Sequence, residues 1–236
     1  METLGSPIGS KEFCESFLQD TINKKLPILL ENLTRLDNPQ ASYLILLFCA
    51  SFCKIVWYIR TVPSDLIAVN CQNFDDLILK TFEGILACGL SSQSIKQMQL
   101  STKFGGIGLR SARNHASAGY ISSFFSSKSL AQSFLQTPIF NPYIESCLSS
   151  LNCTLSEEDR LEFSSEPLTQ KTLSAKIEQF QLSFQQNVVW LTKHSYYVAQ
   201  LHTFLRLDQS FNHFFKQVFK LRVGNCNEKV AWQSNL

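Results

Sequence analysis

The residues whose types and spacing can do chemistry lie between positions 103 and 125, in the stretch KFGGIGLRSARNHASAGYISSFF. Glycines adopt positive φ angles at no steric cost, so the three glycines near the start of this stretch predict a loop. Ser111 then stands where the N-cap of a helix belongs, and we expect a helix to follow it. The three loop glycines are Gly105, Gly106 and Gly108.

This Gly-rich loop is open to two interpretations. In the first, its exposed N–H groups and the N-terminus of the next helix hold a phosphate, with Arg110 and Arg113 beside it. In the second, it is a tight turn into a closely packed helix with solvated arginines, because Ala112, Ala116 and Gly119 are small. The spacing is not G-x-G-x-x-G and no G-K-[ST] follows, so neither a dinucleotide site nor a P-loop is indicated.

The charge around the loop favours the first interpretation. No Asp or Glu occurs between Glu83 and Glu145, while five Lys and Arg residues fall there. A segment that is basic throughout suits a polyanion. We therefore take the loop glycines and the first four of these basic side chains as candidate nucleic-acid contacts. The five basic residues are Lys96, Lys103, Arg110, Arg113 and Lys128.

The other reactive side chains form no recognisable catalytic or metal-binding pattern. The four histidines have no H-E-x-x-H partner, the eight cysteines never form C-x-x-C, and no G-x-S-x-G occurs. We expect reduced, buried thiols, no catalytic residue, and no metal or cofactor in this chain. The sequence NFDD at 73–76 is not taken as a polymerase metal-binding pair, because the surrounding period is helical. Two acids in the first turn of a helix are explained by the helix dipole.

The elements that must position these residues are predicted to be helices. Nineteen Phe with few Gly and Pro indicate an all-α fold, a multi-helix bundle with a second helical region, rather than a β-sandwich. We expect a short extended segment over residues 1–9, a helix from about residue 10 that Pro27 kinks, and a helix over about 74–90.

The stretch 40–60, QASYLILLFCASFCKIVWYIR, is apolar nearly all round and predicts one central helix that is buried on most sides. Its length also suits a transmembrane segment, but a charge such as that of Lys54 is costly in a membrane, so we expect no membrane partner. Nothing at the N-terminus resembles a signal peptide, and we expect an intracellular protein, cytoplasmic or nuclear.

Six stretches, taken in order, resemble the region that follows the catalytic palm in the reverse transcriptases of non-LTR (LINE-type) retrotransposons. They are LGSPIG at 4–9, KLPILLENLTRL, NPQASYLILLFC, YIRTVP at 58–63, FDDLI, and GGIGLRSARNHASAGYISS. The resemblance covers residues 4 to about 125 well and is thinner beyond. It matches the Gly-rich loop and its flanking charges to a turn of that family, and four residues to its primer-grip motif. The primer-grip-like residues are Leu4, Gly5, Ile8 and Gly9.

The resemblance implies an order of domains along the chain. A primer-grip-like turn occupies 1–9, a helical thumb-like domain 10–128, a helical extension 129–148, and a C-terminal helical connector 170–236. Residues 149–169 are rich in Ser, Thr and Glu, and they are predicted to form a polar linker.

The resemblance also implies a function. Whole enzymes of this family copy RNA into DNA with a divalent metal such as Mg, and the palm aspartates would lie upstream of Met1. We therefore expect a fragment that is not an enzyme on its own. It would bind RNA or an RNA–DNA duplex non-specifically through the phosphate backbone, with an upstream palm as partner if part of a longer chain. The family's distal zinc-knuckle cysteines are missing apart from Cys226.

Two alternatives to this function stay open. One is a helical protein-interaction module with no nucleic-acid role, in which the basic segment is a solvated face. The other is insertion of residues 41–59 into a membrane.

Overall fold

The computed structural model describes residues 1–24, 26–135, 141–162 and 169–186. Of these residues 74% are helical and 2% are in strands, which confirms the expected all-α fold. The chain divides into two units, Met1–Val188 and Val189–Leu236. The second unit lies outside the described residues, and with it most of the predicted C-terminal connector.

The N-terminal segment is a two-stranded hairpin, as the predicted extended segment implies. Strand β1 (Glu2–Thr3) pairs antiparallel with β2 (Ser6–Pro7). The two turn residues, Leu4 and Gly5, have φ angles of 51° and 78°, as a two-residue hairpin turn with positive φ requires. The Ser6 hydroxyl lies 2.7 Å from that of Thr61, which attaches the hairpin to the end of helix α4.

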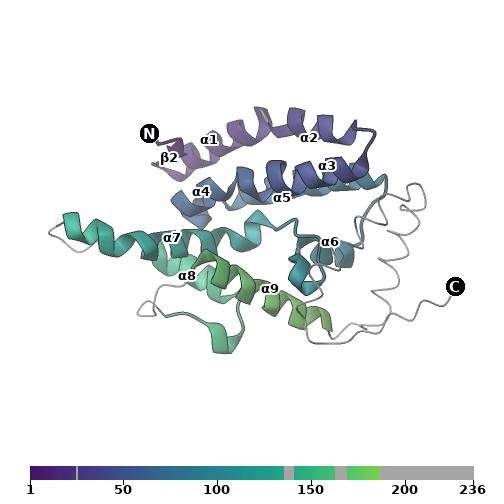
Figure 1. The fold of residues 1–236 in the computed structure, drawn as a ribbon. Coiled ribbons are helices and arrows are strands. Elements are labelled where there is room, and N and C mark those ends of the chain that lie inside the picture. Colours follow the sequence, from purple (N-terminus) through teal and green to yellow (C-terminus); the bar gives the residue numbers. More distant parts are fainter. Residues whose placement is uncertain (25, 136–140, 163–168, 187–236) are drawn as a thin grey trace. The chain divides into compact units, whose positions relative to one another are not determined.

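Helices α1 (Lys11–Lys24) and α2 (Leu26–Thr34) cover the region of the helix that the sequence predicts to be kinked at Pro27. The residue between them, Lys25, lies outside the described residues, so the kink stays a prediction. Both helices pack against α5 (Ala68–Leu86), and Figure 1 shows them lying along one side of it. Their buried face carries Cys14, Leu18, Ile22, Leu26, Leu30 and Leu33.

The predicted helix 40–60 is interrupted. Helix α3 (Pro39–Ile45) begins after Asn38, whose Oδ1 accepts a hydrogen bond from the Ala41 N–H at 3.0 Å. It continues as a π-helical turn, η1 (Leu46–Ala50), and breaks at Ser51. A 3-10 turn, η2 (Phe52–Lys54), then leads into α4 (Val56–Thr61).

The prediction that this stretch is buried on most sides is wrong. Only 33% of its most apolar window is buried, and Phe48 and Trp57 are 66% and 47% exposed. Leu46, Ala50, Ile55 and Ile59 face the core and are at most 1% exposed.

Helix α5 begins at Ala68, after the short turn η3 (Ser64–Leu66), and so starts six residues before the predicted position. Asp75 and Asp76 therefore lie in its interior, and the prediction that they occupy a first turn is wrong. The start gives no sequence signal, because Ile67 at the N-cap has no side-chain hydrogen bond.

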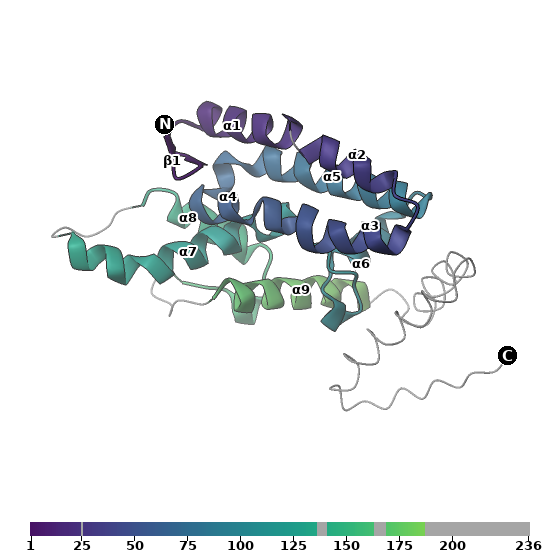
Figure 2. The same cartoon turned by 45° about the horizontal axis from the view of Figure 1, so that its top comes forward.

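Helix α7 (Ala112–Phe134) follows α6 (Ser92–Gln99), the short turn η4 (Thr102–Phe104) and the Gly-rich loop. It packs against α4, α5, α8 (Ile144–Asn152) and α9 (Gln170–Gln186), and Figures 1 and 2 show it between α4 and α9. A Cβ atom on Gly119 would lie 3.2 Å from Ile59 Cγ1, so the expected close approach at the small residues of α7 is confirmed.

A second cluster of buried side chains lies between α7, α8 and α9. It includes Leu151 and Leu155, which fall within the segment 149–169 that the sequence predicts to be a polar linker. Helix α7 also runs through the domain boundary expected after residue 128. The cluster comprises Ala118, Ile121, Cys147, Leu151, Leu155, Leu173 and Ile177.

Candidate nucleic-acid interface

The backbone of the Gly-rich loop is closed on itself. The N–H groups of Gly105, Gly106 and Gly108 donate to the carbonyls of Thr102, Ser101 and Leu100, at 3.3, 3.0 and 2.8 Å. Gly105 and Gly108 have φ angles of 76° and 89°. A Cβ atom on Gly106 would lie 2.0 Å from the Leu100 carbonyl oxygen. The glycines are therefore required by the turn, and their amides are not free to bind a phosphate.

The N-terminus of α7 holds a carboxylate of the chain itself. The expected N-cap is confirmed, since Ser111 Oγ accepts a hydrogen bond from the Asn114 N–H at 3.1 Å. The Asp75 carboxylate, from the interior of α5, accepts from the Ser111 hydroxyl at 2.6 Å. It also accepts from the N–H groups of Ala112 and Arg113, at 2.7 and 3.1 Å.

The Asp75 carboxylate thus occupies the N-terminus of α7, where the first interpretation of the loop placed a phosphate. Burial raises the pKa of its carboxyl to about 6, although hydrogen bonds from Ser111, Ala112 and Arg113 act in the opposite direction. A carboxylate at a helix N-terminus uses the same N–H groups and the same dipole as a bound anion. The first interpretation of the loop is therefore corrected, because these groups already have a partner.

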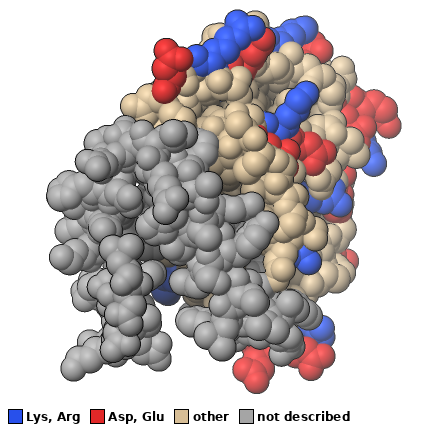
Figure 3. All heavy atoms as spheres, turned by 90° about the vertical axis from the view of Figure 1, so that its right-hand side faces the viewer, with Lys and Arg blue, Asp and Glu red and all other residues tan. Residues whose placement is uncertain are grey.

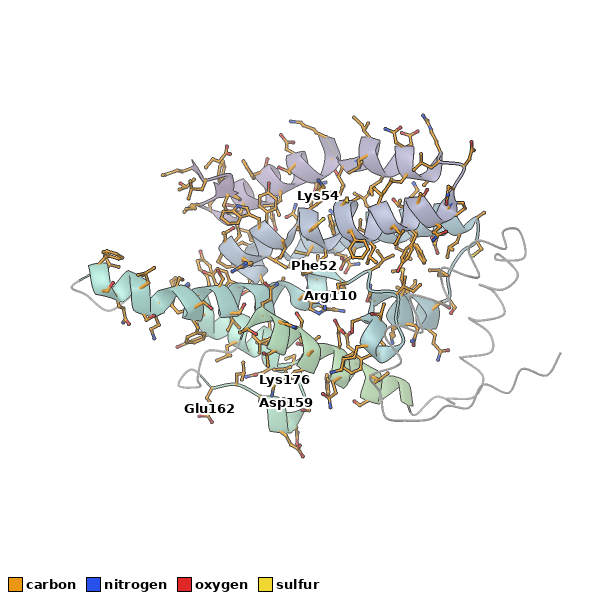
Figure 4. The ribbon with its side chains drawn as sticks, viewed as in Figure 1. Phe52, Lys54, Arg110, Asp159, Glu162 and Lys176 are labelled. Carbon is orange, nitrogen blue, oxygen red and sulfur yellow. The ribbon has the colours of Figure 1, made fainter. Side chains whose placement is uncertain are left out.

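Arg110 is held by a second buried carboxylate, that of Glu178 on α9. Glu178 Oε1 accepts from Arg110 Nε at 3.1 Å, and its Oε2 accepts from the Ser101 N–H at 3.1 Å. The Glu178 side chain is 2% exposed and that of Arg110 is 39% exposed. Figure 4 shows Arg110 beside α9. Glu178 therefore fixes both ends of the Gly-rich loop to α9.

His115 lies next to this pair. Its Nδ1 is 2.9 Å from the Ser111 carbonyl, and its Nε2 is 4.0 Å from Glu178 Oε1. Burial lowers the pKa of the imidazole, and the Phe52 ring meets it edge-on at 5.9 Å between centroids. The histidine and the glutamate are each 1% exposed, so both side chains are enclosed by the protein.

Lys96, Lys103 and Arg113 are exposed, unlike Arg110. Within the part of the chain that the structure describes, none of them has a carboxylate within 4 Å. Lys103 Nζ lies 5.2 Å from the centroid of the Phe104 ring. These three side chains come from α6, η4 and the first turn of α7, the elements on either side of the loop.

The primer-grip-like residues belong to a different part of the structure. Leu4 and Gly5 form the hairpin turn, and the Leu4 and Ile8 side chains are 87% and 56% exposed. The hairpin packs against α1 and α4, whereas the Gly-rich loop packs against α9. The structure does not bring the two predicted groups together in one site.

Charges of both signs share the face drawn in Figure 3. Figure 3 shows Lys and Arg side chains next to Asp and Glu on the described part of that face. Three ion pairs of i, i+4 spacing lie on α1 and at the end of α2. They join Lys11 to Glu15, Lys24 to Asp20, and Arg35 to Glu31.

Sequence reasoning missed Asp75 and Glu178 as partners of the Gly-rich loop. Glu178 directly follows Ile177, which is fully buried, and it lies four residues after the buried Ser174. The sequence feature that could have indicated a buried Glu178 is its position beside the apolar side of a helix. Asp75 carries the same signal, since it directly follows the buried Phe74 and lies four residues after the buried Cys71. Neither signal indicates the partner, because the contacts of Asp75 lie 36 to 38 residues away.

The cysteines in the described residues are free, as expected, but only part of the burial prediction holds. Cys14, Cys71 and Cys147 are buried, and Cys49, Cys53, Cys88 and Cys153 are exposed. Among these residues no group of three or more His, Cys, Asp or Glu could hold a metal ion. The helical stretch Pro39–Thr61 is long and apolar enough to cross a membrane, by length and composition alone.

Comparison of the chain with protein-family models, curated proteins and solved structures gave no match.

Proposed function

We propose that this chain binds nucleic acid non-specifically through the phosphate backbone. The observation that carries the proposal is the division of charge around the Gly-rich loop. The two nearby acids, Asp75 and Glu178, turn inward to the N-terminus of α7 and to Arg110. Lys96, Lys103 and Arg113 remain outside, without a carboxylate within 4 Å among the described residues. Cationic side chains that are free of acids are suited to phosphate contacts.

The roles of the candidate residues differ in this proposal. Lys96, Lys103 and Arg113 contact phosphates. Arg110 positions the loop through Glu178, and the three glycines shape it.

The wider proposal is that the chain is a fragment of a non-LTR reverse transcriptase that lacks the palm. The ordered resemblance of its motifs and its all-α architecture support this proposal. The ligand would be RNA or an RNA–DNA duplex, and an upstream palm would supply the aspartates for a metal such as Mg. On its own the chain would not be an enzyme.

The test compares two variants that lose the same charge. The first combines Lys96→Ala, Lys103→Ala and Arg113→Ala, and the control combines Lys11→Ala, Lys24→Ala and Arg35→Ala, whose cations are paired with acids. The affinity for an RNA duplex is measured by fluorescence anisotropy over a range of salt concentrations. We expect the first variant to lower the salt slope by about 2 to 3, one for each lost phosphate contact.

The control should leave the slope unchanged to within about 0.5, because its cations make no phosphate contact. Equal slopes in the two variants, with both folded by circular dichroism, would contradict the proposal.

One observation favours the second candidate, a helical protein-interaction module. The end of α7 exposes Leu130, Phe134 and Leu135, at 64%, 79% and 53%. Such a helix end can dock into a groove of a partner. A duplex affinity that does not change with salt would favour this function over nucleic-acid binding.

A further inference from the structure

The outward side of the stretch α3–η1–η2–α4 carries a set of exposed side chains of unusual kind. They are two aromatic rings, two thiols and two cations, and we call this set the aromatic-cationic face. Its members are Phe48, Cys49, Cys53, Lys54, Trp57 and Arg60.

The two rings are open to solvent. The Phe48 side chain is 66% exposed and that of Trp57 is 47% exposed. They come from η1 and α4, on either side of the break at Ser51. Three aliphatic residues of the same stretch turn the other way, since Leu46, Ile55 and Ile59 are at most 1% exposed. The most exposed large apolar side chains of the stretch are therefore the two rings.

The charge of the face is of one sign. No Asp or Glu occurs in residues 39–61. In the described part of the chain, neither Lys54 nor Arg60 has a carboxylate within 4 Å. Figure 4 shows Phe52 on the side of η2 toward Arg110 and Lys54 on the other side. The face belongs to η1, η2 and α4, whereas the exposed cations around the Gly-rich loop belong to α6, η4 and α7.

We propose that the aromatic-cationic face binds an unpaired nucleic-acid strand, with bases stacked on Phe48 and Trp57 and phosphates near Lys54 and Arg60. Aromatic rings between cations bind single strands because every base has a flat face and every nucleotide a phosphate. In a duplex, each base is already stacked on its neighbours, so these rings gain nothing from it. This inference rests on the proposed function and adds the kind of strand and the surface that holds it.

An acidic lipid surface is the competing occupant, because it also attracts cations and apolar side chains. The orientation of the stretch favours nucleic acid. Membrane insertion would need the large aliphatic residues of the stretch to face outward, and here Leu46, Ile55 and Ile59 face the core.

The experiment compares Trp57→Leu with Trp57→Phe. Leu keeps an apolar side chain but has no ring, whereas Phe keeps the ring. Affinities are measured for a single-stranded RNA of twelve nucleotides and for the duplex of the same sequence. We expect Trp57→Leu to weaken single-strand binding about 5- to 20-fold and Trp57→Phe to weaken it less than about 3-fold. Duplex binding should be the same in both.

Two further variants guard against a change of fold. Phe48→Leu should also weaken single-strand binding, by about 3- to 10-fold. Phe134→Leu replaces a ring that is 79% exposed at the end of α7 and should change nothing. Equal effects of Trp57→Leu and Trp57→Phe, or of Phe48→Leu and Phe134→Leu, would overturn the inference.

The outcomes separate this inference from the proposed function. Loss of duplex binding in the variant of Lys96, Lys103 and Arg113, with Trp57→Leu behaving as wild type, leaves the proposed function standing and overturns the inference. Failure of the wild-type chain to bind either RNA overturns both. Binding of phosphatidylglycerol vesicles without binding of the single strand overturns the inference in favour of a lipid surface.

Discussion

The Gly-rich loop and the aromatic-cationic face differ in where their polar groups find partners. In the loop, the glycine amides donate to carbonyls of the same turn, Arg110 pairs with Glu178, and Asp75 occupies the N-terminus of α7. In the face, Phe48, Trp57 and the two cations lie in solvent. The Gly-rich loop looked more like a binding motif, but its polar groups are hydrogen-bonded within the protein. The stretch 40–60 was expected to be buried, and it supplies the open surface.

The comparison teaches that a motif must be judged by what remains unpaired after folding. Glycines and a helix N-terminus are equally useful for a phosphate and for a tight joint between helices. Only the long-range contacts of Asp75 and Glu178 decide between these uses. In this chain these contacts assign the loop to the joint, and Lys96, Lys103 and Arg113 keep no carboxylate within 4 Å among the described residues.

The largest expected effect is that of Gly106→Ala on stability. The added Cβ would lie 2.0 Å from the Leu100 carbonyl oxygen, which is backbone and cannot move aside without opening the turn. We expect a loss of about 3 kcal/mol in the free energy of unfolding, measured by urea denaturation. The control is Gly89→Ala, where the nearest atom is 3.9 Å away and the change should stay within about 0.5 kcal/mol. Equal stabilities of the two variants would show that the loop is not closed on itself.

The next effect separates the two arginines that the sequence treats alike. Arg110→Ala removes the partner of a buried carboxylate, and we expect it to lower the free energy of unfolding by about 2 kcal/mol, less than for a fully buried pair because Arg110 is 39% exposed. Arg113→Ala should change it by less than about 0.5 kcal/mol.

The same pair can be tested by a double-mutant cycle. Combining Arg110→Ala with Glu178→Gln should cost less than the sum of the single changes by about 1 kcal/mol, since Gln carries no charge that needs a partner. Additive losses of stability in the cycle, or equal losses for Arg110→Ala and Arg113→Ala, would contradict the pairing of Arg110 with Glu178.

The smallest effect is a dependence of stability on pH at the N-terminus of α7. Burial raises the pKa of Asp75 from its ordinary value near 4 to about 6, so the folded state favours the protonated form. Protonated Asp75 therefore stabilises the folded state fully below about pH 4, and this stabilisation is lost as the pH rises through 6. Relative to Asp75→Asn, wild type should lose stability between pH 4 and 6 and then stay level.

Thermal unfolding at several pH values measures this difference. Asp76→Asn is the control, because Asp76 is the exposed neighbour and accepts a hydrogen bond from Gln72 on the same helix. A gain of stability over the same interval, relative to Asp75→Asn, would mean that the hydrogen bonds from α7 outweigh burial.

Local signals in the sequence predicted the parts of the fold that depend on neighbouring residues. Ser111 caps a helix as its residue type indicates, and Gly119 lies where Ile59 of α4 approaches α7 closely. Each of these features is decided within one or two turns of the chain. The all-α class follows from the same periodicity.

The predictions that were wrong concern features that depend on residues far apart in the sequence. Glu178 reaches Ser101 across 77 residues, and no local pattern indicates that pairing. The exposure of Phe48 and Trp57 depends on how many helices cover α3 and α4, which an apolar sequence cannot specify. The early start of α5 has no cap residue to mark it.

Amide hydrogen exchange by NMR, with and without a single-stranded RNA, tests the central contrast most directly. The N–H groups of Ala112 and Arg113 lie in a first turn, where amides usually exchange fast, yet they donate to Asp75. We predict slow exchange at both in the free protein, no change on adding RNA, and a shift of the Trp57 indole signal. Fast exchange in the free protein that becomes slow only with RNA, while the Trp57 signal stays fixed, would contradict the account.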